Sequence, residues 1–210
     1  MEEQMTPMMK QYMDVKNEYK DSLLFYRIGD FYEMFFDDAL TASKELEITL
    51  TGKDCGMKER APMCGVPYHS VTGYIAKLIG KGYKVAICEQ LEDPSLAKGL
   101  VKRNVTRVIT PGTVIESNML DDKKNNYIAA IYRVGVYYGF AYSDVSTGEF
   151  CTTEAITGNN FSKILDEIAR VMPAEIVVNQ EMAADALGIK TIQDKFNSYI
   201  TIREPSEVEI

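Results

Sequence analysis

Phe31 and Glu33, in the stretch FYE, are the side chains whose types and spacing best fit a specific chemical contact. Alternate side chains of a β-strand leave on opposite faces, so Phe31 and Glu33 project together. Tyr32 and Met34 then point the other way, into a core. An exposed phenyl ring can wedge between base steps of DNA from the minor groove and stack on a base. The alternation therefore predicts a contact face, whereas a core ring beside a solvated carboxylate is the ordinary alternative.

A ring used in this way would select weak points of a duplex rather than a base sequence. Wedging requires unstacking, which costs a few kcal/mol per step, roughly, and this cost is smaller where a base is already mispaired or unpaired. Stacking on the base returns about 1–3 kcal/mol for any base. Glu33, which phosphates repel, could act as a neutral donor once desolvated beneath DNA, or could penalise intact duplex more than distorted duplex.

Four basic residues lie in a window, residues 94–115, that contains no acid. They are Lys98, Lys102, Arg103 and Arg107. The net charge of −8 argues against nucleic acid, but residues 1–115 carry 15 basic and 16 acidic side chains while residues 116–210 carry 8 and 15. We therefore predict that the window contacts phosphates. The alternatives are a solvated loop or, for Arg103 and Arg107, pairing with acids of the core.

The elements that must position these residues follow from sequence periodicity. In the first part of the chain the pattern predicts a mixed α/β domain with a strand on each side of the turn at Gly29-Asp30. Its expected helices cover residues 7–19, 37–46 and 71–79. Its expected strands cover residues 23–28, 31–35, 47–52, 83–91 and 105–113.

A polar, charged segment, ESNMLDDKKNN at residues 116–126, is typical of a domain linker. Beyond it the pattern predicts three antiparallel strands, then a helix, a further strand and a short helix that ends at Gly188. The strands are expected over residues 126–133, 136–145, 148–155 and 174–179, and the helices over 160–172 and 181–187. This order is typical of a ribonuclease H-like domain. Because the acidic end of the chain has no natural stop, we expect the domain to be incomplete.

Five motifs, in their order and spacing, resemble the amino-terminal part of the MutS family of DNA mismatch sensors. They are TPMMKQY, LLFYRIGDFYEMFFDDA, APMCGVPYHS, VAICEQLEDP and VTRVITPGT. The stretch AYSDVSTGEF extends the resemblance more loosely into the connector domain of the family. The resemblance implies a mismatch-recognition domain with a mixed sheet and flanking helices at residues 1–115, a linker at 116–126, and an incomplete ribonuclease H-like connector at 127–210.

The resemblance also assigns roles to single residues. It implies that Phe31 stacks on a mispaired or unpaired base and that Glu33 hydrogen-bonds this base. In the family the loop TGKDCGMKERAPMCGVPYH approaches the minor groove beside the ring, which makes Lys53 a groove contact. Relatives often have a longer basic pair there, and Asp54 weakens this assignment. Met63 either packs under the loop or contacts DNA.

For the whole protein the resemblance implies a dimeric, DNA-dependent ATPase that binds mismatched double-stranded DNA. A MutL-type partner and the sliding clamp are further expected partners, and the expected location is the cytoplasm, in association with the nucleoid. The chain has no phosphate-loop sequence, so ATP and Mg²⁺ would bind in another part of the family protein. We expect no enzyme activity, cofactor, metal or membrane segment in these 210 residues.

Two other functions compete with this interpretation. A ribonuclease H-like sheet could carry a metal-dependent nuclease site centred on Asp144, with Glu149, Glu154 and Glu175 as partners, although no motif brings them together. The acidic second half could instead be a module that binds only proteins. A zinc site is not expected, because Cys64 and His69 offer two ligands where four are usual.

Overall fold

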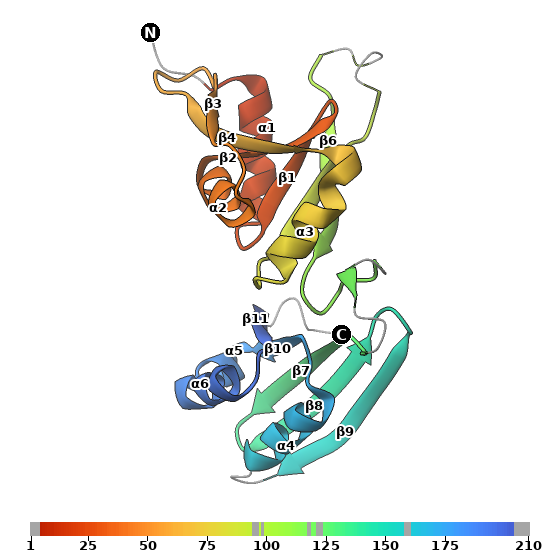
Figure 1. Cartoon of the computed structure of the whole chain (residues 1–210). Coiled ribbons are helices and arrows are strands. Elements are labelled where there is room, and N and C mark those ends of the chain that lie inside the picture. The colour runs from red at the N-terminus through yellow and green to blue at the C-terminus, as the bar shows by residue number, and fades with distance from the viewer. Residues whose placement is uncertain are drawn as a thin grey trace. The chain divides into compact units, whose positions relative to one another are not determined.

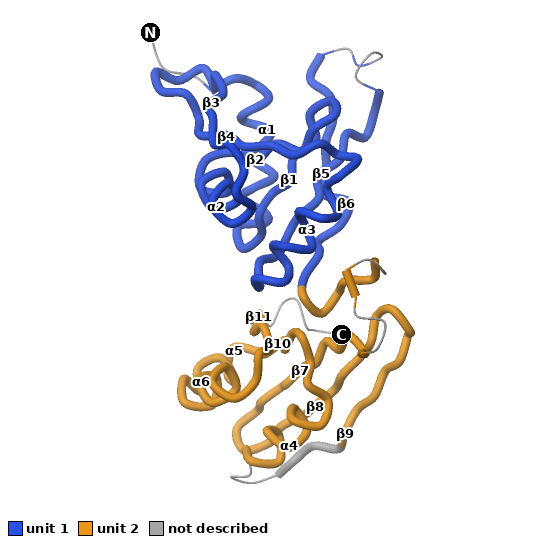
Figure 2. The backbone as a smooth tube through the Cα atoms, viewed as in Figure 1, with its two compact units in different colours: residues 1–110 blue, residues 111–210 orange. Residues whose placement is uncertain are grey.

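The computed structural model describes residues 5–93, 97, 99–116, 119–120, 124–157 and 161–203, with only the backbone of 154–157. The chain forms two compact units, Met1–Thr110 and Pro111–Ile210 (Figure 2). The division precedes the charged segment in which the sequence analysis places the linker. Residues just after it belong to the second unit, because the Gly112 N–H donates to Glu175 Oε2 at 3.1 Å and Val114 is buried.

Unit 1, residues 1–110, is built on a six-stranded mixed sheet, which confirms the predicted mixed α/β class (Figure 1). Its strands are β1 (Leu23–Ile28), β2 (Phe31–Phe35), β3 (Thr51–Lys53), β4 (Ala61–Pro67), β5 (Val85–Gln90) and β6 (Arg103–Ile109). They lie in the order β3-β4-β2-β1-β5-β6, with β1 parallel to β5 and the other neighbours antiparallel. Its helices are α1 (Pro7–Glu18), α2 (Phe36–Leu46), the 3-10 helix η1 (Tyr68–Ser70) and α3 (Val71–Ile79).

Helices cover both faces of this sheet, so the first four residues of its central strand β1, LLFY, are all buried. On one face Tyr12 of α1 packs edge-on against Tyr26 and Phe35, with ring centroids 5.3 and 4.9 Å apart. On the other face α2 packs against β4, where the Cys64 thiol lies 3.5 Å from the Ala39 carbonyl. The helix α3 packs against α2, β4 and β5.

The structure differs from the sequence prediction in one part of this sheet, the segment between α2 and α3. The sequence predicts a strand over 47–52 and a loop to residue 70, whereas the structure has a short β3 and places β4 between β3 and β2. Glu47 ends α2 in the left-handed region, at φ 58°, so no strand begins there. The glycines and prolines that predict a loop lie instead within or beside β4.

Unit 2, residues 111–210, has a five-stranded sheet in the order β11-β10-β7-β8-β9. Its strands are β7 (Tyr127–Val134), β8 (Tyr137–Asp144), β9 (Glu149–Thr157), β10 (Glu175–Asn179) and β11 (Tyr199–Arg203). The first three form an antiparallel meander, and β10 and β11 add in parallel beside β7. This arrangement confirms the predicted ribonuclease H-like class. Its helices are α4 (Phe161–Val171), α5 (Gln180–Ala183) and α6 (Ala186–Lys195).

The last third of unit 2 departs from the sequence prediction. The strand β11 and most of α6 were not expected, and Gly188 lies in the first turn of α6 instead of ending a helix. Asp185 caps α6 by accepting from the Gly188 N–H at 2.9 Å. A Cβ on residue 188 would lie 3.0 Å from the Asp185 carboxylate, so the glycine permits the capping contact.

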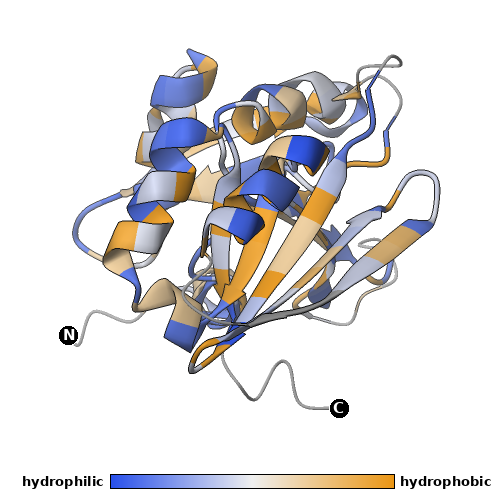
Figure 3. Ribbon diagram, turned by 90° about the horizontal axis from the view of Figure 1, so that it is seen from below, coloured by the Kyte–Doolittle hydropathy of each residue, from blue (hydrophilic) through white to orange (hydrophobic). Residues whose placement is uncertain are grey.

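The helices of unit 2 contribute to one apolar core against its sheet. Ile164 and Ile168 of α4 and Ile192 of α6 are fully buried together with Ile131 and Phe140 of the meander. In Figure 3 the strands are largely apolar, and the helices carry both apolar and hydrophilic residues. Because each helix has a buried apolar side and a hydrophilic side, apolar residues recur at helical spacing in its sequence. Among the described residues, no helix has both the length and the apolar character needed to cross a bilayer.

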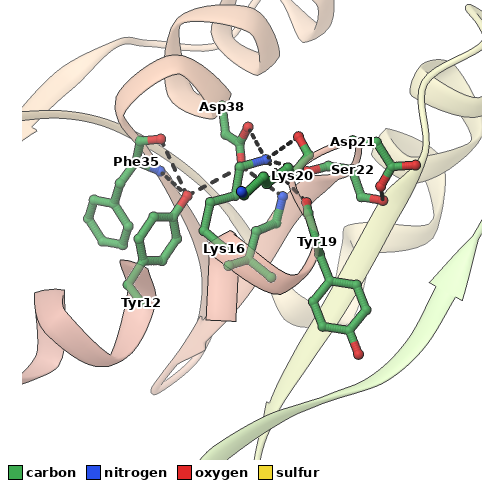
Figure 4. Close-up of polar contacts among 9 residues, drawn as sticks. Tyr12, Lys16, Tyr19, Lys20, Asp21, Ser22, Phe35 and Asp38 are labelled. Carbon is green, nitrogen blue, oxygen red and sulfur yellow. Dashed lines mark hydrogen bonds and ion pairs between the residues drawn. The ribbon is translucent and has the colours of Figure 1, made fainter. Parts of the chain in front are cut away.

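A buried polar network joins α1 to the junction of β2 and α2 in unit 1 (Figure 4). Asp38, in the first turn of α2, accepts from the Leu24 N–H at 2.9 Å and pairs with Lys16 Nζ at 2.9 Å. The Tyr12 hydroxyl lies 3.3 Å from Asp38 Oδ2 and accepts from the Phe35 N–H at 3.4 Å. Burial, followed by the charge of Asp38, raises the pKa of Tyr12 and keeps it a neutral hydroxyl.

Replacing Asp38 tests how far unit 1 depends on this network. Asp38→Ala leaves the Leu24 N–H without its acceptor and Lys16 without its ion-pair partner, although Lys16 Nζ keeps its bond to the Ser22 carbonyl. We expect the free energy of unfolding to fall by about 3 kcal/mol. Urea unfolding followed by circular dichroism measures the change. Glu45→Ala, which removes a partly exposed carboxylate bound to the exposed Lys81, is the control and should have the smaller effect. Equal effects of the two variants would contradict the role given to Asp38.

Candidate nucleic-acid interface

The ring of Phe31 lies at the start of β2 and is 46% exposed. Its neighbours Tyr32 and Met34 are buried on the opposite face, so the predicted alternation is confirmed. Phe35, on the same face as Phe31, is buried beneath Tyr12. The helix α1 therefore covers the end of this face and leaves its beginning open, where Phe31 lies.

Glu33, the second residue of this face, forms an ion pair that the sequence analysis did not predict. Its Oε2 lies 2.5 Å from Nζ of Lys53, and the two side chains are 15% and 29% exposed. The Lys53 ammonium also lies 5.6 Å from the centre of the Phe35 ring. Gly65 lies opposite Glu33 on β4, and a Cβ there would be 3.5 Å from Glu33 Cγ. The structure thus joins two predicted contact residues to each other.

The turn before Phe31 is held by a residue pair that the sequence analysis missed. The Arg27 guanidinium lies 3.7 Å from the centre of the Tyr68 ring, and its Nε donates to the Gly29 carbonyl. The Tyr68 N–H donates to the Asp30 carbonyl at 2.9 Å. These contacts fix the turn from both sides. The only sequence signal was an arginine next to an apolar run, which does not identify its stacking partner.

Arg103, a predicted phosphate contact, is committed to hydrogen bonds inside unit 1. Its Nε donates to the Arg27 carbonyl at 2.8 Å, and its Nη1 donates to Gln11 Oε1 at 3.0 Å. The guanidinium also lies 5.0 Å from the centre of the Tyr26 ring. Burial raises the pKa of Tyr26 to about 12, an effect that the charge of Arg103 only partly offsets. Arg103 thus ties β6 to β1 and α1, at the end of the sheet that carries Phe31.

Of the other predicted DNA contacts, those that the structure describes lie on β4, on β6 and just before β6. Lys102 is exposed beside Arg103, and its backbone N–H donates to Glu92 Oε1 at 2.8 Å. Arg107 is partly exposed further along β6, opposite Ile87. Met63 is partly buried against the core beside Phe35, as its packing alternative expects. Lys98 lies outside the described residues.

Asp144, the centre of the alternative nuclease site, caps a turn at the end of β8. Its Oδ1 accepts from the backbone and hydroxyl of Ser146 at 2.9 and 2.6 Å, and its Oδ2 accepts from the Asn126 N–H at 3.2 Å. Although burial raises the pKa of Asp144, hydrogen bonds from Ser146, Asn126 and Thr147 outweigh this effect and hold the pKa below its ordinary value. The carboxylate is therefore held as a turn cap.

The expected partners of Asp144 belong to separate networks. Glu149 accepts from the Tyr127 hydroxyl at 3.0 Å, and Glu175 accepts from the Thr201 hydroxyl at 2.6 Å. The side chain of Glu154 lies outside the described residues. Among the side chains that the structure describes, no three carboxylate, histidine or cysteine groups come together as metal ligands would. The arrangement therefore does not support the convergent carboxylates that two-metal chemistry requires.

Comparison with known proteins links both units to one family. The family model described as MutS domain I matches residues 6–118, and that described as MutS domain II matches residues 126–209. Proteins named DNA mismatch repair protein MutS are similar to the chain in Acetivibrio thermocellus (63% identity over 94% of this chain and 23% of that protein) and Ruminiclostridium cellulolyticum (57% over 97% and 23%). A third, from Clostridioides difficile, is 62% identical over 83% of this chain and 18% of its own length. The chain spans less than a quarter of these relatives.

The lowered pKa of Asp144 gives a pH test of its capping role. A carboxylate whose pKa is lower in the folded state stabilises the fold above its unfolded-state pKa, and this stabilisation is lost as the pH falls through the folded-state value. Asp144→Asn carries no charge to lose. We expect the stability difference between wild type and variant to be largest above about pH 5 and to shrink below about pH 4. Urea unfolding across this range measures it, and a difference independent of pH would contradict the assignment.

Proposed function

The chain belongs to the MutS family, and on this premise we propose that unit 1 recognises mispaired or unpaired bases in double-stranded DNA. The relatives named above are DNA mismatch repair proteins, and the chain spans the part that matches domains I and II of the family. In this proposal residues 1–115 are the mismatch-recognition domain and residues 127–210 are the connector. Phe31 makes the contact by entering the minor groove.

The observation that carries the proposal is the half-exposed ring of Phe31 on a rigid strand end. A phenyl ring that remains in water when its strand neighbours are buried has apolar surface left for a partner. The contacts of Arg27 and Tyr68 hold the turn before the ring, so little conformational freedom would be lost on binding. Such a ring suits the stacked bases of DNA, which offer a flat apolar surface.

Discrimination in this proposal comes from the DNA rather than from base readout. Stacking yields about 1–3 kcal/mol, and opening a base step costs a similar amount, so a sound duplex gives little net gain. A mispair has already lost part of its stacking and bends easily, which lowers the cost. One ring can therefore serve many different lesions. Glu33 supplies a hydrogen bond to the base that Phe31 stacks on.

Phosphate contacts would position the ring along the duplex without reading sequence. Lys102 is exposed at the end of the sheet that carries Phe31, and Lys98 and Arg107 are further candidates. Arg103 supports this surface by linking β6 to β1 across the intervening strand β5. A phosphate contact by its side chain would have to replace the bonds it makes there. Each phosphate contact on duplex DNA adds about 0.9 to the slope of log affinity against log salt.

Further properties concern the length of the family protein that this chain does not span. We propose a homodimer coupled to an ATPase whose ATP and Mg²⁺ bind outside residues 1–210, because these residues contain no phosphate-loop sequence. A MutL-type partner, the sliding clamp and a cytoplasmic, nucleoid-associated location belong to the same proposal. A nuclease centred on Asp144 is not favoured, because the carboxylate is bound as a turn cap.

Competition between two duplexes tests the proposal directly. A fluorescent duplex with one mispair or one unpaired base is displaced at low salt by the same duplex either mismatched or fully matched. For Phe31→Ala we expect the preference for the mismatched duplex to fall by about 5- to 150-fold, the equivalent of the lost stacking, while matched binding persists. Leu40→Ala, an exposed apolar side chain on α2, is the control and should keep the preference. An unchanged preference in Phe31→Ala would overturn the proposal.

A further inference from the structure

We infer that Lys53 determines how strictly unit 1 rejects well-paired DNA, and that it does so by pairing with Glu33 rather than by contacting a phosphate. This inference rests on the proposed function. It revises the expectation from the sequence, in which Lys53 and Glu33 were two independent contacts. The carrying observation is the ion pair between Lys53 Nζ and Glu33 Oε2 at 2.5 Å.

The path of the Lys53 side chain shows that it is directed inward. Lys53 belongs to the three-residue strand β3, which pairs only with β4, yet its ammonium reaches Glu33 on β2. The same ammonium lies 5.6 Å from the centre of the buried Phe35 ring. A lysine that binds phosphates usually keeps its ammonium in water, whereas the side chain of Lys53 is only 29% exposed.

The ion pair occupies one carboxylate oxygen of Glu33 and leaves the other as a possible acceptor. Oε2 is bound by Lys53, and within the described part of the chain no group donates to Oε1. Because Gly65 on the neighbouring strand has no side chain, the carboxylate lies against bare backbone on that side. Lys53 therefore orients Glu33 and leaves one oxygen as an acceptor for a base that Phe31 has displaced.

The charge of the pair matters as much as its geometry. A bare carboxylate two residues from the inserting ring would repel the phosphates of any duplex, sound or damaged. Paired with Lys53, it presents little net charge at a distance but still accepts a hydrogen bond at close range. Only a duplex that opens enough to offer a base edge gains from Glu33, so the pair rewards mismatches selectively.

Substitutions at both positions separate this role from a phosphate contact. The readout is the ratio of affinities for mismatched and matched duplex, measured by the same competition. For Lys53→Met we expect the ratio to fall by about tenfold, the lower end of coupling for close charge pairs. In a Glu33→Gln background, Lys53→Met should leave the ratio unchanged. Lys53→Arg should keep most of it, and Lys58→Met, an exposed lysine of the same loop, is the matched control.

Each result decides between the possibilities. A lysine that only contacts phosphate would weaken both duplexes equally, so an unchanged ratio in Lys53→Met overturns the inference. A lysine that reads the base itself would lower the ratio in the Glu33→Gln background as well, which also overturns it. Failure of the proposed function appears separately, because the wild-type ratio itself would then be close to one. Thermal unfolding of each variant checks that the fold is retained.

Discussion

Asp38 holds together the layers on which the rest of unit 1 depends. Its carboxylate joins β1, through the Leu24 N–H, to α1, through Lys16 and Tyr12. Because α2 starts directly after β2, the same contact fixes where the strand with the exposed ring ends. A buried carboxylate with several donors has few alternative positions, so it specifies one arrangement of these elements.

This arrangement makes a single strand serve two purposes. Along one face of β2, Phe35 is buried under α1 while Phe31, four residues earlier, remains in water. Both rings share a face because side chains alternate, and α1 covers Phe35, through Tyr12, but leaves Phe31 exposed. The exposed ring is thus a continuation of the core, on a strand whose other face is also packed. Stiffness at the ring follows from the core behind it.

Much of the fold, and the exposed face of β2, could be predicted from the sequence, because local rules determine them. The alternation of FYEMF, the start of α1 at Pro7 and the order of the meander in unit 2 depend on neighbours in the chain. The prediction failed where distant residues decide the structure. The strand β4 resembles a loop in composition, and only its pairing with β2 and β3 makes it a strand. The pairs Glu33–Lys53 and Arg27–Tyr68 join residues far apart in sequence, so no spacing rule predicts them.

The short edge strand β3 has a consequence for how this site could change over time. Lys53 is its last residue, and the seven residues that follow form a loop on the margin of the sheet. Apart from Cys55, which is buried in the core, insertions or substitutions at the exposed positions of this loop leave the interior intact, but they would move the ammonium relative to the carboxylate it neutralises. The stringency of mismatch recognition proposed for unit 1 is therefore open to evolutionary adjustment, or to engineering, at positions where folding imposes few restrictions.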